Sequence, residues 1–372
     1  MRLGISLYPH LIAENYDLAG YLTKCVKAQI KVVFTTLINV KKSDQQVFQR
    51  FLSLTKIANK LGMDVYGDVD GTVYEEFGLD KNNREQIMDF FIIELGLKGI
   101  RFDCGVSPED MAKLTHNHQD IKIILNASNP AEEVAYLLSL QAKKSNLVSC
   151  WNFYPQRYTA SSLSYFTEKI AALKASGILS QAFVALQRSD AQGPWQHNDK
   201  LPSIEMHRDL SLDFQVRHFV ALGVDDIIVS TQFLNDTELM VLTNINLHKI
   251  TLNLKPAVDI TSVEQKILND QSVHFVRPDL AEYIIRSTFS RLKYHDNDIP
   301  VRHFKGKYFE KGDVVILNNN AQNYKGELQI VTKQMANDGI RNLAGHLEES
   351  EQSIVACLTP NCEFSFNLAK ES

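Results

Sequence analysis

GIRFDCGVSPEDMAKL, residues 99–114, contains the pattern that decides the fold. The run GIRFD has the composition of a β-strand, and a polar turn follows it. Ser107 then stands directly before Pro108. This is a common helix start, because serine caps free backbone amides and proline fits the first turn. The stretch therefore predicts one strand followed by one helix.

The same pattern of strand, turn and helix recurs along roughly the first 250 residues. Strand-like runs begin near residues 3, 31, 63, 99, 121, 147, 181 and 225, and a second helix start, NDTE, lies at Asn235. Eight such units over this length are typical of a (β/α)8, or TIM, barrel. A doubly wound sheet is the alternative fold, but no G-x-G-x-x-G follows the first strand.

The pattern changes near residue 250, where KITLNLKPAVDITSVEQ indicates an exit strand and a connector. The runs DVVILN, GELQIVTK and SIVACLT then predict short strands separated by turns. We therefore expect an α/β protein with two domains. A barrel would span residues 1–248, and a smaller β domain would span residues 260–368.

The composition is that of an ordinary globular chain, with 44% hydrophobic residues, 22% charged residues and a net charge of -5. Without a basic excess, nucleic acid is not expected as a partner. No run approaches the roughly 18 apolar residues of a membrane span, and MRLGISLYPH resembles a strand more than a signal peptide. The five cysteines contain no C-x-x-C pair. We expect reduced thiols, a cytoplasmic protein and no membrane partner, and leave open whether the chain forms a homo-oligomer.

Carboxylates dominate the chemistry expected at the barrel mouth, where the strands end. Asp68 and Asp70 stand two apart in GDVDG, so they point to the same face of their strand. Asp103 ends the next strand, and Glu205 lies in the loop after strand seven. Glycosidic cleavage generally requires two facing carboxylates, one of them protonated, and Asp68 with Glu205 is the expected pair. The alternative is that these acids only cap helices or form ion pairs.

Several short motifs together carry a resemblance to one bacterial family. In chain order they are LGISLYP at the start, RFDCG at 101–105, LNASN at 125–129, NFYPQ at 152–156, GPW at 193–195, LPSIEMHR at 201–208, RST at 286–288, PVR at 300–302 and YKGELQI at 324–330. In the order and spacing of these motifs, the chain resembles the 6-phospho-N-acetylmuramidases.

The resemblance implies a TIM barrel followed by a cyclophilin-like β-barrel. It also implies hydrolysis of the bond between N-acetylmuramic acid 6-phosphate and N-acetylglucosamine inside the cell, during cell-wall recycling. The acids of the family match Asp68, Asp103 and Glu205. The family usually has a non-acidic residue where this chain has Asp70, whose charge would either raise the pKa of Asp68 or simply face solvent.

The expected substrate contacts follow from this chemistry, because a sugar ring needs aromatic faces beside amides and hydroxyls. In WNFYPQRYT, residues 151–159, we expect Trp151 to offer a face, and Phe153 and Tyr158 to lie in the core. Phosphate calls for donors such as arginine. The expected ligands are Tyr8, Asn126, Asn152, Tyr154 and Gln156 for the sugar, and His207, Arg208, Arg286 and Arg302 for the phosphate.

No metal or other cofactor is expected, because His10, His197 and His207 share no ligand-like spacing. A sugar-phosphate isomerase, epimerase or aldolase is the main alternative function, since a barrel serves it equally. No lysine ends a barrel strand to form a Schiff base, however. A third hypothesis is a peptide-binding protein or prolyl isomerase built on the second domain, which would leave the polar barrel mouth unexplained.

Overall fold

The computed structural model describes residues 1–38, 40–128, 132–195 and 198–369. Asn39 and His197, which the sequence places near the barrel mouth, lie outside these ranges. The chain divides into two compact units. The first comprises residues 1–219 and 223–245, and the second comprises residues 220–222 and the chain from residue 246 onward. No helix in the described ranges has the length and apolar character needed to cross a membrane.

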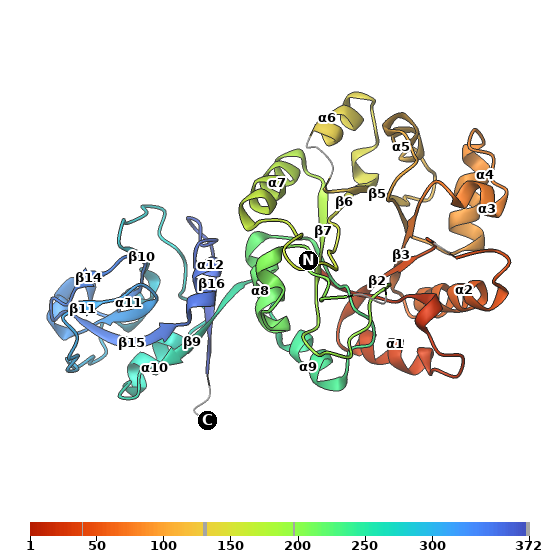
Figure 1. Ribbon diagram of the computed structural model, residues 1–372. Coiled ribbons are helices and arrows are strands. Elements are labelled where there is room, and N and C mark those ends of the chain that lie inside the picture. Colours follow the sequence, from red (N-terminus) through yellow and green to blue (C-terminus); the bar gives the residue numbers. More distant parts are fainter. Residues whose placement is uncertain (39, 129–131, 196–197, 370–372) are drawn as a thin grey trace. The chain divides into compact units, whose positions relative to one another are not determined.

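The first unit contains a closed barrel of eight parallel strands in chain order (Figure 1). All eight strands predicted from the sequence are confirmed, and each begins within two residues of its expected start. They are β1 Arg2–Ser6, β2 Ile30–Thr36, β3 Asp64–Val69, β4 Gly99–Phe102, β5 Lys122–Asn126, β6 Leu147–Cys150, β7 Leu179–Val184 and β8 Asp226–Val229.

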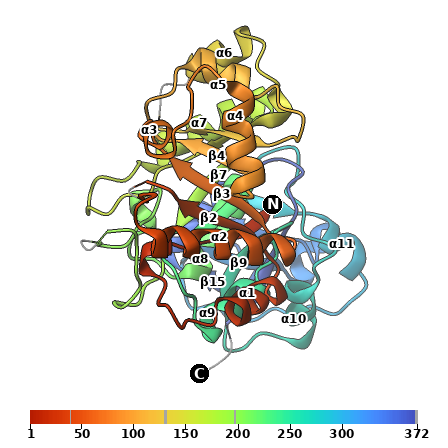
Figure 2. The same cartoon turned by 90° about the vertical axis from the view of Figure 1, so that its right-hand side faces the viewer.

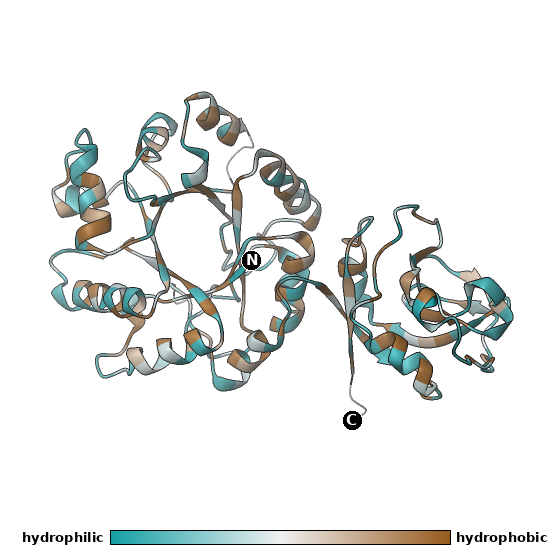
Figure 3. Ribbon diagram, turned by 180° about the vertical axis from the view of Figure 1, so that it is seen from behind, coloured by the Kyte–Doolittle hydropathy of each residue, from teal (hydrophilic) through white to brown (hydrophobic). Residues whose placement is uncertain are grey.

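Helices surround these strands, with α1 against β2 and α2 against β3 (Figures 1 and 2). Each shows both hydrophobic and hydrophilic stretches, as expected when one face packs and the other meets water (Figure 3). Both predicted helix starts are confirmed: Ser107 accepts from the amide of Asp110 at 3.1 Å, and Asn235 forms a capping box with Glu238. The helices are α1 Leu18–Lys27, α2 Gln45–Lys60, α3 Val73–Phe77, α4 Arg84–Asp89, α5 Pro108–Leu114, α6 Glu132–Ser139, α7 Leu163–Ser176, α8 Leu212–Leu222 and α9 Asp236–Asn244.

Large side chains fill the inside of the barrel, so it is a packed core rather than a pore. The buried cluster contains Val32, Phe34, Tyr66, Ile124, Val148, Cys150, Phe183 and Ile228. Phe153, which follows β6, packs on this cluster while remaining partly exposed. The barrel core therefore supports the loops at the carboxyl ends of the strands.

The second unit contains a six-stranded mixed sheet in the order β10, β13, β12, β15, β9, β16, with a separate pair of strands, β11 and β14. KITLNLKP, expected as an exit strand, supplies β9 of this sheet. The prediction that SIVACLT is a strand was wrong, because its first residues belong to helix α12; a short apolar run does not distinguish a buried strand from a buried helix. The cyclophilin-like barrel stays a prediction.

The described elements of this second unit are as follows. The strands are β9 Ile250–Pro256, β10 Ile284–Ser287, β11 Tyr308–Phe309, β12 Asp313–Leu317, β13 Leu328–Val331, β14 Met335–Ala336, β15 Arg341–Leu347 and β16 Phe364–Leu368. The helices are α10 Ser262–Asn269, α11 Phe289–Tyr294 and α12 Gln352–Val355.

Candidate active site

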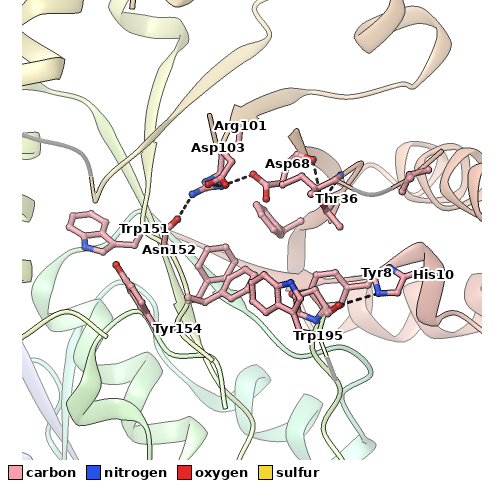
Figure 4. Close-up of a pocket in the computed structure, with 16 residues that line it drawn as sticks. Tyr8, His10, Thr36, Asp68, Arg101, Asp103, Trp151, Asn152, Tyr154 and Trp195 are labelled. Atoms are coloured by element: carbon pink, nitrogen blue, oxygen red, sulfur yellow. Dashed lines mark hydrogen bonds and ion pairs between the residues drawn. The ribbon is translucent and has the colours of Figure 1, made fainter. Parts of the chain in front are cut away.

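A cavity of about 550 Å³ lies at the carboxyl ends of the barrel strands, where barrel enzymes place their chemistry (Figure 4). Its lining belongs entirely to the first unit. Ten of the lining residues carry a polar side-chain atom, and the other six are aromatic or aliphatic. The lining comprises Tyr8, His10, Phe34, Thr36, Ile38, Val40, Asp68, Arg101, Asp103, Trp151, Asn152, Phe153, Tyr154, Phe183, Pro194 and Trp195.

Two aspartates and one arginine form the acidic wall of the cavity, a name we keep for Asp68, Arg101 and Asp103 (Figure 4). Strands β3 and β4 are neighbours, and their register sets Asp68 opposite Arg101. Nη1 of Arg101 donates to Oδ1 of Asp68 at 2.5 Å and to Oδ1 of Asp103 at 3.1 Å. The strand pairing thus brings together two of the three predicted acids.

The shared nitrogen limits the separation of the two carboxyl groups. Because both Oδ1 atoms contact the same nitrogen, they lie no more than 5.6 Å apart, the sum of the two distances. Carboxyl groups that leave room for a water between them stand roughly 6.5 to 9.5 Å apart, whereas those of retaining glycosidases stand about 5 to 5.5 Å apart. The two Oδ1 atoms of the pair are therefore too close together for the wider arrangement.

Asp68 is only 9% exposed, and its burial raises its pKa to about 6. The charge and hydrogen bond of Arg101 act in the opposite direction, and the carboxylates of Asp103 and Asp70 add small upward contributions. Asp70 does not line the cavity; its Oδ1 accepts from the backbone amide of Thr72 at 3.0 Å. Asp68 can therefore be protonated near neutral pH, mainly because it is buried.

Four aromatic residues of the lining form a second group, the aromatic wall, which we define as Phe34, Phe153, Phe183 and Trp195. The ring centroid of Phe153 lies 4.9 Å from that of Phe183 and 5.5 Å from that of Trp195. Trp195 is 50% exposed, and its loop is held where Nε2 of His10 lies 3.3 Å from the carbonyl oxygen of Pro194. The lining of the cavity thus combines ionisable groups with aromatic rings.

The stretch Trp151–Thr159 is used differently from our expectation. The side chain of Trp151 is fully buried and packs on Phe166 with centroids 4.3 Å apart, so its faces are not free for a sugar. Tyr154 does line the cavity, and its hydroxyl lies 3.1 Å from that of Ser128. Phe153 packs on the core as expected but also lines the cavity. The prediction that Tyr158 lies in the core was wrong, since it is 85% exposed.

Glu205 does not face Asp68 across the cavity, which corrects the expected pairing. It lies outside the cavity lining, in the 3-10 turn Glu205–His207, and Arg208 donates to both of its oxygens, at 2.6 and 2.8 Å. The same oxygens accept from the backbone amides of Tyr158 and Ala160. The hydrogen bonds of Arg208 above all lower the pKa of Glu205 to about 2, so it remains ionised.

The Arg208 side chain is only 1% exposed, and its guanidinium nitrogens are all engaged in hydrogen bonds. Beyond Glu205, its guanidinium donates to the backbone carbonyls of Tyr154, Gln156 and Asp199 at 3.1, 3.0 and 2.5 Å. Together, Glu205 and Arg208 connect the loop after β6 to the loop after β7. They act as a backbone clamp, and we use that name for this pair below.

The other predicted sugar ligands are dispersed. Asn152 lines the cavity and follows β6, whereas Asn126 lines a second, smaller cavity of about 70 Å³. Gln156 is exposed and lies outside the lining. Tyr8 borders the main cavity with a buried ring, and its hydroxyl donates to the carbonyl of Ser230 at 2.6 Å. Of these, Asn152 and Tyr154 have side-chain polar groups in the lining and side chains that are not fully buried.

The predicted phosphate ligands each have a partner. His207 is fully buried, and its Nε2 lies 3.0 Å from Nδ1 of His218. In the second unit, Arg286 pairs with buried Glu327 at 2.8 Å, and Arg302 pairs with buried Glu264 at 2.9 Å. Such pairing within the fold could not be recognised from sequence alone.

Trp195 is a lining residue for which no role was predicted, whereas Arg101 is the ion-pair partner that the alternative reading of the acids requires. For Trp195 a signal existed, since a tryptophan after Gly-Pro in the loop following a barrel strand has little reason to be buried. Arg101 is separated from Asp103 by one residue, so the two share a strand face. Among the described residues, no group of three or more histidines, cysteines and acids could hold a metal ion.

Two family models match the chain. Their descriptions are 6-phospho-N-acetylmuramidase, N-terminal, over residues 3–244, and 6-phospho-N-acetylmuramidase, C-terminal, over residues 250–367. Among solved structures, an uncharacterized B. cereus protein is 34% identical, with 98% of this chain and 99% of that chain covered and a TM-score of 0.85. A conserved Enterococcus faecalis protein with an unknown function is 25% identical, with 99% and 96% covered and a TM-score of 0.67. A comparison with curated proteins gave no match.

Proposed function

Because the chain belongs to the 6-phospho-N-acetylmuramidase family, we propose that it hydrolyses N-acetylmuramic acid 6-phosphate linked to N-acetylglucosamine, within the cytoplasm and in cell-wall recycling. The observation that supports this most is the acidic wall. It combines a buried Asp68, whose pKa is raised to about 6, with the carboxyl group of Asp103 beside it. A protonated acid next to a second carboxylate is the equipment of a glycosidase.

In this proposal Asp68 is the general acid. It gives its proton to the glycosidic oxygen as the bond from that oxygen to the anomeric carbon breaks. Asp103, whose side chain is 43% exposed, faces the same cavity and either attacks the anomeric carbon or orients the 2-acetamido group that attacks it. Water then cleaves the intermediate, and Asp68 takes a proton back from that water. Both routes retain the anomeric configuration.

The aromatic wall would bind the apolar faces of the sugar. Trp195, half exposed at the cavity, offers a face for a ring, and Phe153 supports it from the core. Glu205 is assigned to the backbone clamp and not to proton transfer, because Arg208 and two backbone amides occupy its oxygens. Its effect on activity would be indirect, through the position of the loops.

The 6-phosphate calls for a cation without a carboxylate partner. We assign this role to Lys41 and Lys42, directly after the cavity residue Val40. Both lysines are exposed, and within the described ranges neither side chain forms an ion pair. Arg208, by contrast, would have to give up a bidentate carboxylate to bind phosphate.

The proposed function is tested by incubating the purified protein with the phosphorylated disaccharide and measuring release of N-acetylglucosamine. We expect turnover by the wild type that persists with a chelator, and strong discrimination against the disaccharide without phosphate. An Asp68→Asn variant should lose nearly all activity. Absence of turnover on the phosphorylated disaccharide would contradict the proposal, and loss of activity with chelator followed by rescue with zinc or manganese would contradict the metal-free mechanism.

A further inference from the structure

Arg101 does more than hold two acids, because its second terminal nitrogen reaches a third group. Nη2 of Arg101 donates to Oδ1 of Asn152 (Figure 4). A guanidinium has only donors, so the group that faces it must be the oxygen of the Asn152 amide and not its NH2. The chemistry of Arg101 therefore sets the orientation of this amide.

With its oxygen bound to Arg101, Asn152 presents its NH2 group elsewhere. Within the described residues, Nδ2 of Asn152 forms no hydrogen bond, and it is not among the buried polar atoms. The residue itself lines the cavity. The backbone of Asn152 is also held, because its carbonyl accepts from the hydroxyl of Ser203 at 2.9 Å. Two N–H donors are thus held beside the cavity by the contacts of Asn152 with Arg101 and Ser203.

The surroundings of this donor are specific. On one side stands Asp103, whose carboxylate shares Arg101 with Asn152 and accepts hydrogen bonds. On the other side the chain continues into Phe153, whose ring belongs to the aromatic wall. A ligand group that contacts Asn152, Asp103 and Phe153 together would need three parts. It would carry a carbonyl oxygen for Nδ2 of Asn152, an N–H for the carboxylate of Asp103 and a small apolar end for the ring of Phe153.

We propose that Asn152, oriented by Arg101, recognises the carbonyl oxygen of the 2-acetamido group of the sugar. The acetamido group carries a carbonyl for Asn152, an N–H for Asp103 and a methyl for Phe153. A hydroxyl at the same carbon could use the donor and the carboxylate, but it would leave the aromatic side without a partner. The inference rests on the proposed function and adds to it a residue that determines substrate specificity. Arg101 is then a positioning residue for Asn152 as well as for the acids.

The test measures binding, so that it does not depend on turnover. Isothermal titration calorimetry would compare N-acetylmuramic acid 6-phosphate with an analogue in which a hydroxyl replaces the acetamido group. Asn152→Asp keeps the shape but replaces the donor with an acceptor, and Asn152→Ala removes the group. Asn83→Asp is the matched control: Asn83 caps α4 by accepting from the amide of Gln86 at 3.0 Å, and aspartate caps equally well.

We expect the wild type and the control to prefer the acetamido sugar by about tenfold, the equivalent of one good hydrogen bond with its apolar contact. Both Asn152 variants should bind the two sugars about equally, with melting temperatures close to that of the wild type. Equal binding of both sugars by the wild type, or a preference retained in both variants, would overturn the inference while leaving the proposed function intact. If the wild type bound neither sugar and did not cleave the disaccharide, the proposed function would fail, and the inference with it.

Discussion

The acid role of Asp68 predicts a pH dependence of the reaction. A general acid works in its protonated form, and burial raises the pKa of Asp68 to about 6. The rate constant kcat/KM should therefore be highest below that pH and decline above it. The protonated fraction falls about tenfold for each pH unit, so about 1% of the maximal value should remain at pH 8.

The same pKa carries a cost for the folded state. The ordinary value for aspartate is 3.8, so a value near 6 means that keeping Asp68 ionised in the fold costs about 3 kcal/mol. For an acid with a raised pKa, this penalty is absent below pH 3.8 and grows as the pH rises toward 6. The free energy that destabilises the carboxylate is what makes Asp68 a proton donor near neutral pH.

The decisive measurement is a pH profile of kcat/KM from pH 4.5 to 8.5 for the wild type, Asp68→Asn and Asp70→Asn. Asp68→Asn should lose between 10²- and 10⁴-fold and have no decline near pH 6, since asparagine does not titrate. Asp70→Asn is the control, because Asp70 contributes only a small upward shift and bonds to Thr72; it should retain most activity. More than about a tenth of wild-type activity in Asp68→Asn would refute the assignment.

Three further predictions concern the clamp, the stereochemistry and the phosphate. Glu205→Gln should lower both the activity and the melting temperature, the latter by several degrees, because buried Arg208 loses its charged partner. A large loss of kcat with an unchanged Tm, measured by calorimetry, would instead indicate that Glu205 is a catalytic acid. NMR of the first anomer released should show retention, and inversion would contradict the close spacing of the two aspartates. Lys41→Met with Lys42→Met should raise KM for the phosphorylated disaccharide only, whereas an equal loss on the unphosphorylated one would exclude a phosphate contact.

The barrel could be predicted from the sequence because its signals are local. Each strand such as GIRF is a short β-rich run, and each helix start such as Ser107 has a recognisable cap. Asp68 and Asp103 could also be found, because they stand at the ends of adjacent strands. The position of a residue relative to the end of its predicted strand is sufficient to predict contacts between side chains on neighbouring strands.

The remaining features depend on the paths of loops. Glu205 lies far into the segment between β7 and α8. Its ion pair with Arg208, three residues further on, agrees with the alternative that the acids only form ion pairs, but the local sequence did not show whether Glu205 would reach the cavity. The pairing of Arg286 with Glu327 joins residues 41 positions apart, beyond any periodic pattern. The contact between the rings of Phe153 and Trp195 likewise became visible only when two loops met.

The backbone clamp bears on how this site can change during evolution. Glu205 accepts from main-chain amides, and Arg208 donates to main-chain carbonyls, so the clamp does not depend on which side chains those loop residues carry. Positions such as Gln156 and the exposed Tyr158 can therefore mutate without loosening the loop. Directed evolution toward other sugar substituents would do well to diversify cavity residues such as Tyr154, which Arg208 holds by its backbone carbonyl, and keep residues 205 and 208 constant.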